Sequence, residues 1–434
     1  MSPELVGLAG LAAMVVLMLL RMPVALAMFA VGFAGVAILR DTASAMSLLA
    51  SESFTLASSA ELVVVPLFIL MGNVASATGM SRALYDAAHA VIGHVRGGLA
   101  SATILGCGGF AALSGSSVAA ALTMGRVSMA EMERFGYDTR LSTGVVAAGG
   151  TLGILIPPST GFVIYAILTQ QSIGKLFLTG VLPGILLLSL FMLAVTLLCR
   201  LDPRLGPRSP RSGRAQRLRA LTGAAPILVI VCLTIGGIYG GLFSPVEAAA
   251  VGAGLVMLAG ALQRRLTIAV LWAAARDSVV TTATVMLILI ASHMINPFLA
   301  LSHIPSTVGT FLTGLPVGPM VVLAMILGCY LVLGCFLDGF AMLVLTLPIF
   351  FPVITQLGFD PVWFGVLVVL TLEMGLISPP VGMNVFIVKS VARHVPLGRI
   401  FAGVLPFWLA MLAALGLLVA FPQIVLILPE TMIP

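Results

Sequence analysis

Oxygen-bearing residues interrupt two strongly apolar parts of this sequence. The segment "LSGSS", residues 113 to 117, supplies three serine hydroxyls beside Gly115, and "FLDG", residues 336 to 339, supplies the carboxyl of Asp338. Hydroxyl, carboxylate and carbonyl oxygens suit hard cations, and glycine lets the backbone approach closely. If these segments cross a membrane, a carboxylate there is expensive and points to function. Serines in such segments also join helices, so a structural role stays open for each of them.

Two proline pairs break other apolar stretches, at "GILIPPSTG", residues 153 to 161, and "GLISPPVG", residues 375 to 382. A proline lacks an amide donor and clashes with the preceding turn, so it frees carbonyl groups that are costly to leave unpaired in hydrocarbon. Unwound carbonyls and helix C-termini can coordinate a cation, while helix N-termini attract an anion. One such pair could merely kink a packed helix, but two matched copies favour a binding site. The polar residues flanking the breaks are Thr151, Ser159, Ser378 and Asn384.

The elements that hold these residues must be membrane helices. Of 434 residues, 60% are apolar and only 8% are charged, against about a quarter in soluble domains. Apolar runs of spanning length recur along the chain, and we expect ten to twelve membrane passes. Clear runs cover residues 5 to 20, 23 to 39, 62 to 77, 176 to 198, 223 to 243 and 400 to 421. The longest polar stretch, residues 199 to 222, is too short for a soluble catalytic domain.

The interruptions and proline pairs together form a repeat. Gly115 precedes Pro157 by 42 positions, and Gly339 precedes Pro379 by 40. Positive charge lies before the first proline pair and after the second, and residues 296 to 361 contain no Lys or Arg. Because Lys and Arg accumulate in cytoplasmic loops, the two units should cross the membrane in opposite senses. Inverted repeats with broken helices are typical of secondary transporters.

The basic residues also orient the chain. Residues 199 to 219 carry seven arginines and one aspartate in a Pro- and Gly-rich segment, which we place in the cytoplasm as a flexible loop. If two helical hairpins enter and leave on one side, only Arg40 and Lys175 of the 21 Lys and Arg lie outside, and both termini are periplasmic. The net charge of +6 is spread over short loops, so no nucleic-acid partner is expected. Binding of phosphate or lipid by the arginine loop is an alternative to a purely topogenic role.

Other chemistries are less well supported. Glu61, Glu247 and Glu373 lie at or within apolar segments and could bind protons, cap helices or pair across them. We expect no cofactor or transition-metal site, since no paired Cys spacing occurs, and no Walker motif is present to bind ATP. An intramembrane protease would need a histidine base facing Ser114 or a second carboxylate held close to Asp338. His89 and His94 lie in a polar loop, and the apolar segments contain no second Asp. A passive channel is disfavoured because paired breaks favour alternating access.

Several motifs resemble those of one transporter family. These are "PLFILMG" (66 to 72), "SGSS" (114 to 117), "GGTLGILIPPS" (149 to 159) and "EMGLISPPVGMN" (373 to 384). They resemble the large membrane subunit of tripartite ATP-independent periplasmic (TRAP) transporters, within the ion transporter superfamily, over essentially the whole chain. The resemblance implies an all-α polytopic fold with inverted repeats, two re-entrant hairpins and two broken helices, working as an elevator. It also implies sodium-driven uptake of an organic acid, a periplasmic binding protein and a small four-helix membrane subunit.

Carried onto this sequence, the resemblance places one sodium between the first interruption and the first break, and another between Gly334, Asp338 and the second break. The expected sodium-binding residues are Ser114, Gly115, Ser116, Ser117, Thr151, Pro157, Gly334, Asp338, Gly339, Gly375, Ser378 and Pro379. The expected substrate-binding residues are Ser116, Pro158, Ser159, Pro380 and Asn384. A related symporter or antiporter that needs no binding protein stays open as an alternative.

The expected domain organisation follows the repeat. Transport units should cover residues 81–175 and 276–395, each with one hairpin and one broken helix. Scaffold helices should cover residues 1–80, 176–275 and 396–434, the central part carrying the basic loop 199–222. The expected location is the bacterial inner membrane.

Overall fold

Helices account for the regular structure throughout residues 2–432, the part of the chain described by the computed structural model. Within that part, eight helical segments are long and apolar enough to cross a membrane, and shorter apolar helices such as α1 (Pro3–Leu19) and α2 (Val24–Leu39) accompany them. The helices coincide with the apolar runs noted above. The expected all-α polytopic fold, with two hairpins and two broken helices, is therefore confirmed.

An outer group of helices packs around the long helix α13, which contacts α2, α3 and α4. Polar N-cap residues explain where several helices of this group begin. Asp41 caps α3, Thr267 caps α13, and Ser244 with Glu247 forms a reciprocal capping box on α12. Glu247 is thus a helix cap. Besides α1 and α2, the outer helices are α3 (Thr42–Ser58), α4 (Val64–Ala77, after the short 3-10 helix Ala60–Val63), α11 (Arg214–Tyr239), α12 (Pro245–Leu262) and α13 (Ile268–Leu301).

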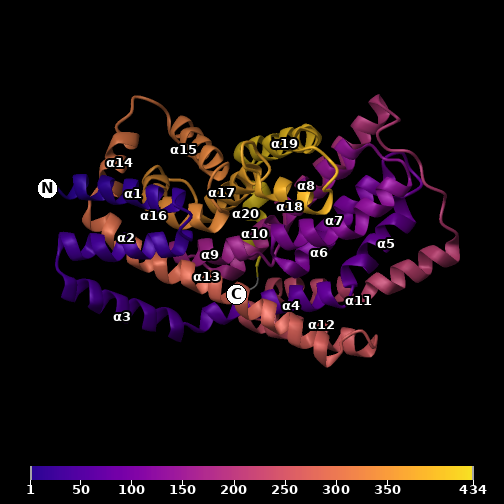
Figure 1. Cartoon of the computed structure of the whole chain (residues 1–434), viewed down its shortest axis with the longest axis horizontal. Coiled ribbons are helices and arrows are strands. Elements are labelled where there is room, and N and C mark those ends of the chain that lie inside the picture. The colour runs from indigo at the N-terminus through magenta and orange to yellow at the C-terminus, as the bar shows by residue number, and fades with distance from the viewer. Residues whose placement is uncertain (1, 433–434) are drawn as a thin grey trace.

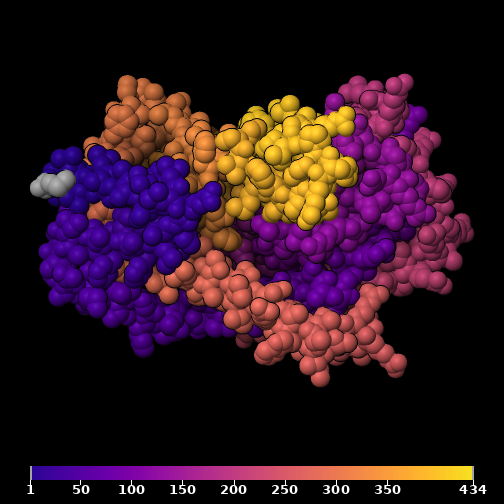
Figure 2. All heavy atoms as spheres, viewed as in Figure 1, coloured from indigo at the N-terminus to yellow at the C-terminus, as the bar shows by residue number. Residues whose placement is uncertain are grey.

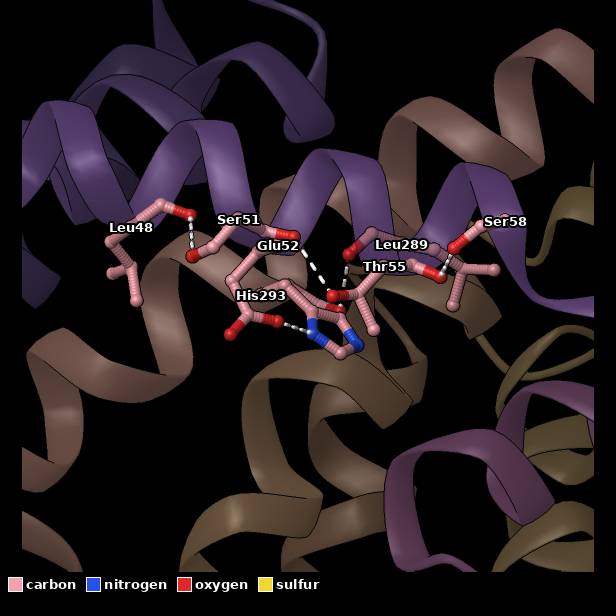
Figure 3. Close-up of polar contacts among 8 residues, drawn as sticks. Leu48, Ser51, Glu52, Thr55, Ser58, Leu289 and His293 are labelled. Carbon is pink, nitrogen blue, oxygen red and sulfur yellow. Dashed lines mark hydrogen bonds and ion pairs between the residues drawn. The ribbon is translucent and has the colours of Figure 1, made fainter.

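A polar contact inside the outer group ties α3 to α13. The Glu52 carboxyl lies 2.7 Å from Nδ1 of His293, while neighbouring Ser and Thr hydroxyls of α3 donate to carbonyls of their own helix (Figure 3). A hydroxyl that donates to a carbonyl of the preceding turn has its hydrogen-bond partner within its own helix. His293 therefore serves a helix–helix contact.

A central group contains both repeats. Its hairpins are α6 (Gly98–Ser114) with α7 (Ser117–Arg134), and α15 (Pro319–Gly334) with α16 (Gly339–Gln356). Its broken helices are α8 (Thr139–Leu155) with α9 (Thr160–Thr169), and α17 (Pro361–Gly375) with α18 (Met383–Val391). The group is completed by α10 (Ile173–Leu201), α19 (Leu397–Ala420) and α20 (Gln423–Glu430).

The two repeats enter the molecule from opposite ends. In Figure 1, α6 and α7 lie toward the end that holds the basic segment, whereas α15 and α16 lie toward the end that holds the N-terminus. Both tips reach the middle. In Figure 2, the yellow C-terminal helices gather on the visible face between these ends. The reversed placement agrees with the reversed charge pattern of the sequence.

Two further helices join the groups. The helix α5 (Met80–Ile92) packs against α6 and α11, and α14 (Ile304–Thr313) packs against α16 and α13. Near the base of the first hairpin, the amide of Leu99 donates to the Tyr137 hydroxyl at 3.1 Å. Burial raises the pKa of Tyr137 to about 12. The contact fixes the start of α6 relative to the turn before α8.

One expectation needs revision. The arginine-rich loop is shorter than expected, because α10 continues to Leu201 and α11 begins at Arg214, where good helix formers follow one another. The helix α19 packs chiefly on α8, and α10 packs on α19, α20 and α6 as well as on the broken helices. The division of the chain into transport and scaffold units stays a prediction.

Candidate ion and substrate site

Helix ends of both repeats converge on the middle of the central group. In the first repeat α6 ends at Ser114 and α8 at Leu155, while Ser116 and Ser159 cap the starts of α7 and α9. The serine hydroxyls accept from the amides of Ala119 and Phe162, each at 3.3 Å. Two carbonyl-rich ends and two amide-rich ends thus meet in one place. Such ends attract cations and anions respectively.

The tip of the first hairpin is bound to the first break through backbone. Gly115 adopts a left-handed conformation with φ +58°, and a Cβ there would lie 2.6 Å from the Pro158 carbonyl oxygen. Its own carbonyl accepts from the Thr160 hydroxyl at 2.8 Å. Only glycine fits this approach. Thr160 was not among the expected site residues, although its hydroxyl directly follows the break.

The second repeat has the matching parts. Gly334 ends α15, Gly375 ends α17, and the Asp338 carboxyl caps α16 by accepting from the Phe340 amide at 3.2 Å. Gly382, with φ +60°, precedes α18 and provides no side-chain cap. Each break contains a cis peptide bond between its two prolines, at Pro157–Pro158 and Pro379–Pro380.

Glycines at equivalent positions let each hairpin tip touch its broken helix. Gly153 and Gly375 each lie four residues before a proline pair. A Cβ at Gly153 would lie 2.5 Å from the Ser116 carbonyl oxygen, and one at Gly375 would lie 2.6 Å from Cα of Gly334. The contact brings hairpin carbonyls next to the unwound backbone in both repeats. Gly153 was quoted in the sequence motif but was not assigned to the site.

The repeats also interlock. The hydroxyl of Ser117 on α7 donates to Oε2 of Glu373 on α17 at 2.7 Å, and both side chains are buried. The half-helix α18 packs against α7 and α8, while α9 packs against α16. Each broken helix therefore rests on the other repeat's hairpin. Glu373, for which the sequence allowed several roles, forms the polar link between them.

Several buried polar atoms at this centre have no hydrogen-bond partner within residues 2–432. They are Oγ of Ser114, Oε1 of Glu373, and both amide atoms of Asn384. A buried polar group without a partner costs free energy, so such atoms point to a ligand. Hydroxyl and carboxylate oxygens suit a hard cation, and the Asn384 amide can donate to an anion.

Other expected residues have hydroxyls engaged by protein. Thr151 donates to the Ala148 carbonyl at 2.6 Å and lies 4.0 Å from Sδ of Met411 on α19. Ser378 donates to the Met374 carbonyl at 2.7 Å and accepts from Nε1 of Trp408 at 2.9 Å. The structure thus places Thr151 toward α19, and it holds Ser378 between its own helix and Trp408, a contact that the sequence did not indicate.

Comparison with known proteins identifies the family. Residues 11–424 match the family model described as the DctM component of the tripartite ATP-independent periplasmic transporter. The chain belongs to this family. It is therefore a membrane component of a transporter and not an enzyme, which removes the protease alternative. The family expected from the sequence motifs is confirmed.

Relatives share this assignment over most of their length. The C4-dicarboxylate TRAP transporter large permease protein DctM of Pseudomonas aeruginosa is 36% identical over 383 residues, covering 88% of this chain and 89% of the relative. The sialic acid TRAP transporter large permease protein SiaM of Vibrio cholerae is 32% identical, covering 85% and 86%. The crystal structure of the YdaH transporter of Alcanivorax borkumensis has a similar fold, with a TM-score of 0.64, 16% identity, and coverage of 89% and 90%.

Proposed function

We propose that this DctM component is the large permease of a sodium-driven importer of an organic acid in the bacterial inner membrane, with both termini in the periplasm. A periplasmic binding protein delivers the acid, and a small four-helix membrane subunit completes the transporter. The tripartite nature of the family supports these partners. Two relatives are named for C4-dicarboxylate and for sialic acid, both of which carry carboxylate, and this supports an acidic substrate.

The observation that carries the proposal is the pairing of each hairpin tip with an unwound, glycine-lined helix break. In the first repeat, the unpartnered hydroxyl of Ser114 and the carbonyls near Gly153 offer oxygens for one sodium ion. In the second repeat, the carbonyls near Gly334 and Gly375 and the carboxyl of Asp338 offer oxygens for another. Cation binding would satisfy groups that are otherwise costly to bury.

The same arrangement supports an anionic substrate. The starts of α9 and α18 point their amide ends into the region where the breaks meet, and Asn384 contributes a buried amide with no protein partner. The start of α18 lacks a side-chain cap, and the backbone amides of Asn384 and Val385 donate to the carbonyls of Leu376 and Gly382. The unpartnered donor at this end is therefore the side-chain amide of Asn384. A carboxylate held there would lie beside the cations, which links its binding to sodium.

We further propose that the central group moves past the outer group as an elevator. Across this boundary, the hydroxyls of Ser76 on α4 and Thr123 on α7 form a hydrogen bond of 3.2 Å. The contact between α4 and α6 at Gly72 brings backbone close to Ser114 without an intervening side chain. Side-chain hydrogen bonds between the two groups are few among the described residues, and this favours sliding.

Sodium binding can be tested without transport. The purified protein should unfold at a higher temperature as NaCl replaces KCl at constant ionic strength, because a ligand that binds only the folded state stabilises it by mass action. The Ser114→Ala variant should need a higher sodium concentration for the same shift. Equal unfolding temperatures in NaCl and KCl would refute sodium binding at these sites.

A further inference from the structure

A polar cavity of about 530 Å³ lies outside the transport site, between α5 and the first turns of α11. The two helices lie side by side at the end of the molecule that holds the basic segment (Figure 1). Arg219 on α11 and Arg265, just after α12, both line this cavity. Two helices and the segment that follows a third therefore bring side chains to one cavity.

The cavity has an excess of unused positive charge. Among the described residues, neither the Arg219 nor the Arg265 guanidinium forms an ion pair or a hydrogen bond. The carboxyl of Asp86 is the acid in the lining, and burial raises its pKa. Two guanidinium groups thus face one carboxyl. Each guanidinium presents a planar fork of donors that matches phosphate oxygens.

Further polar side chains complete the lining. Ser212, Gln216 and His89 border the cavity beside the arginines, and Nε2 of His89 lies 3.3 Å from the Ser209 hydroxyl. The first turn of α11 contains no acidic residue, and Gly213 gives it no side-chain cap, so its amide end adds positive potential. Hydroxyl, amide and imidazole groups next to paired guanidiniums make a set of donors for an oxyanion.

The position of the cavity fits the membrane boundary. The spanning helix α12 ends at Leu262, three residues before Arg265, and the charged first turns of α11 precede its apolar part. Basic pockets at the cytoplasmic boundary attract anionic lipid headgroups. We propose that this cavity binds a phosphate group, carried by an anionic phospholipid or present as free phosphate. Because α5 packs on the first hairpin and α11 on the outer group, the bound phosphate would bridge the two groups.

The proposal can be tested by titrating the full-length protein in phosphatidylcholine nanodiscs, either with short-chain phosphatidylglycerol or with inorganic phosphate. Arg219→Gln and Arg265→Gln should each weaken binding about tenfold, the size expected for a charge-assisted hydrogen bond. Asp86→Asn should tighten binding severalfold, since it removes the opposing carboxyl; misfolding would not produce such a gain. Arg214→Gln and Arg264→Gln serve as matched controls and should change affinity less than twofold, because neither arginine lines the cavity.

Binding of either probe that depends on Arg219 and Arg265 supports the site, and the probe that binds identifies the source of the phosphate. The proposal is overturned if neither probe binds. It is also overturned if the control variants weaken binding as much as Arg219→Gln and Arg265→Gln, since the effect would then be general surface attraction.

Discussion

At the scale of single residues, the Ser117–Glu373 hydrogen bond is the polar link between the repeats. Its donor comes from the first hairpin and its acceptor from the second broken helix, 256 positions apart in sequence. The other carboxyl oxygen of Glu373 has no protein partner. The bond therefore joins the two repeats and leaves one oxygen of Glu373 without a protein partner.

Replacing Ser117 by alanine should lower the free energy of unfolding by on the order of 1 kcal/mol. Interhelical hydrogen bonds in membranes average about 0.6 kcal/mol, and a buried carboxyl left unpartnered adds to the loss. Ser128→Ala is the matched control, because Ser128 is buried on the same helix but donates only to the Met124 carbonyl of that helix. Denaturant unfolding of both variants measures the difference, and equal losses would show that the link contributes nothing specific.

At the scale of elements, the half-helices work only because hairpin tip and break can touch. Gly153 and Gly375 occupy equivalent places in the two repeats, and each would push against hairpin backbone if it carried a Cβ. Backbone cannot swing away as a flexible side chain can. The two glycines therefore control the geometry of the carbonyl groups around each break.

The substitutions Gly153→Ala and Gly375→Ala should each raise the sodium concentration for half-maximal uptake by roughly tenfold or more, since overpacking of this kind costs about 1–3 kcal/mol. Gly254→Ala is the control: this glycine of α12 has open space around it, and alanine should be neutral or stabilise by up to about 1 kcal/mol. Uptake at graded sodium concentrations gives the comparison. Unchanged sodium dependence in both site variants would contradict the proposed role of these contacts.

The sequence was sufficient to predict the breaks and the reversal between repeats. Proline pairs break a helix wherever they occur, and the positions of the arginines indicate which loops are cytoplasmic. It could not predict which side of α8 Thr151 faces, since Thr151 lies in a segment whose residues are all buried and no periodicity distinguishes its faces. The bond between Ser117 and Glu373 joins distant segments and leaves no local pattern. The same holds for Trp408 and Ser378.

At the scale of the whole molecule, the proposed movement requires the central and outer groups to change contacts. The hydroxyls of Ser76 and Thr123 lie 3.2 Å apart across that boundary. If α7 slides past α4, this pair must separate during every transport cycle. The contact therefore reports on one position of the central group.

A cysteine pair at these positions tests the movement. In a background where the exposed Cys232 and Cys329 are replaced by serine, the Ser76→Cys, Thr123→Cys protein should lose uptake on oxidation and regain it on reduction. Each single variant should stay active under oxidant. Full uptake by the cross-linked protein would show that these helices need not move apart.

The most direct test of the central claim is uptake of labelled organic acids by proteoliposomes that contain this chain and its small membrane subunit, with and without an inward sodium gradient and with and without the binding protein. Our account predicts uptake of at least one acid that requires both the gradient and the binding protein. Uptake that proceeds equally without sodium, or no sodium-linked flux of any acid by folded protein, would contradict it.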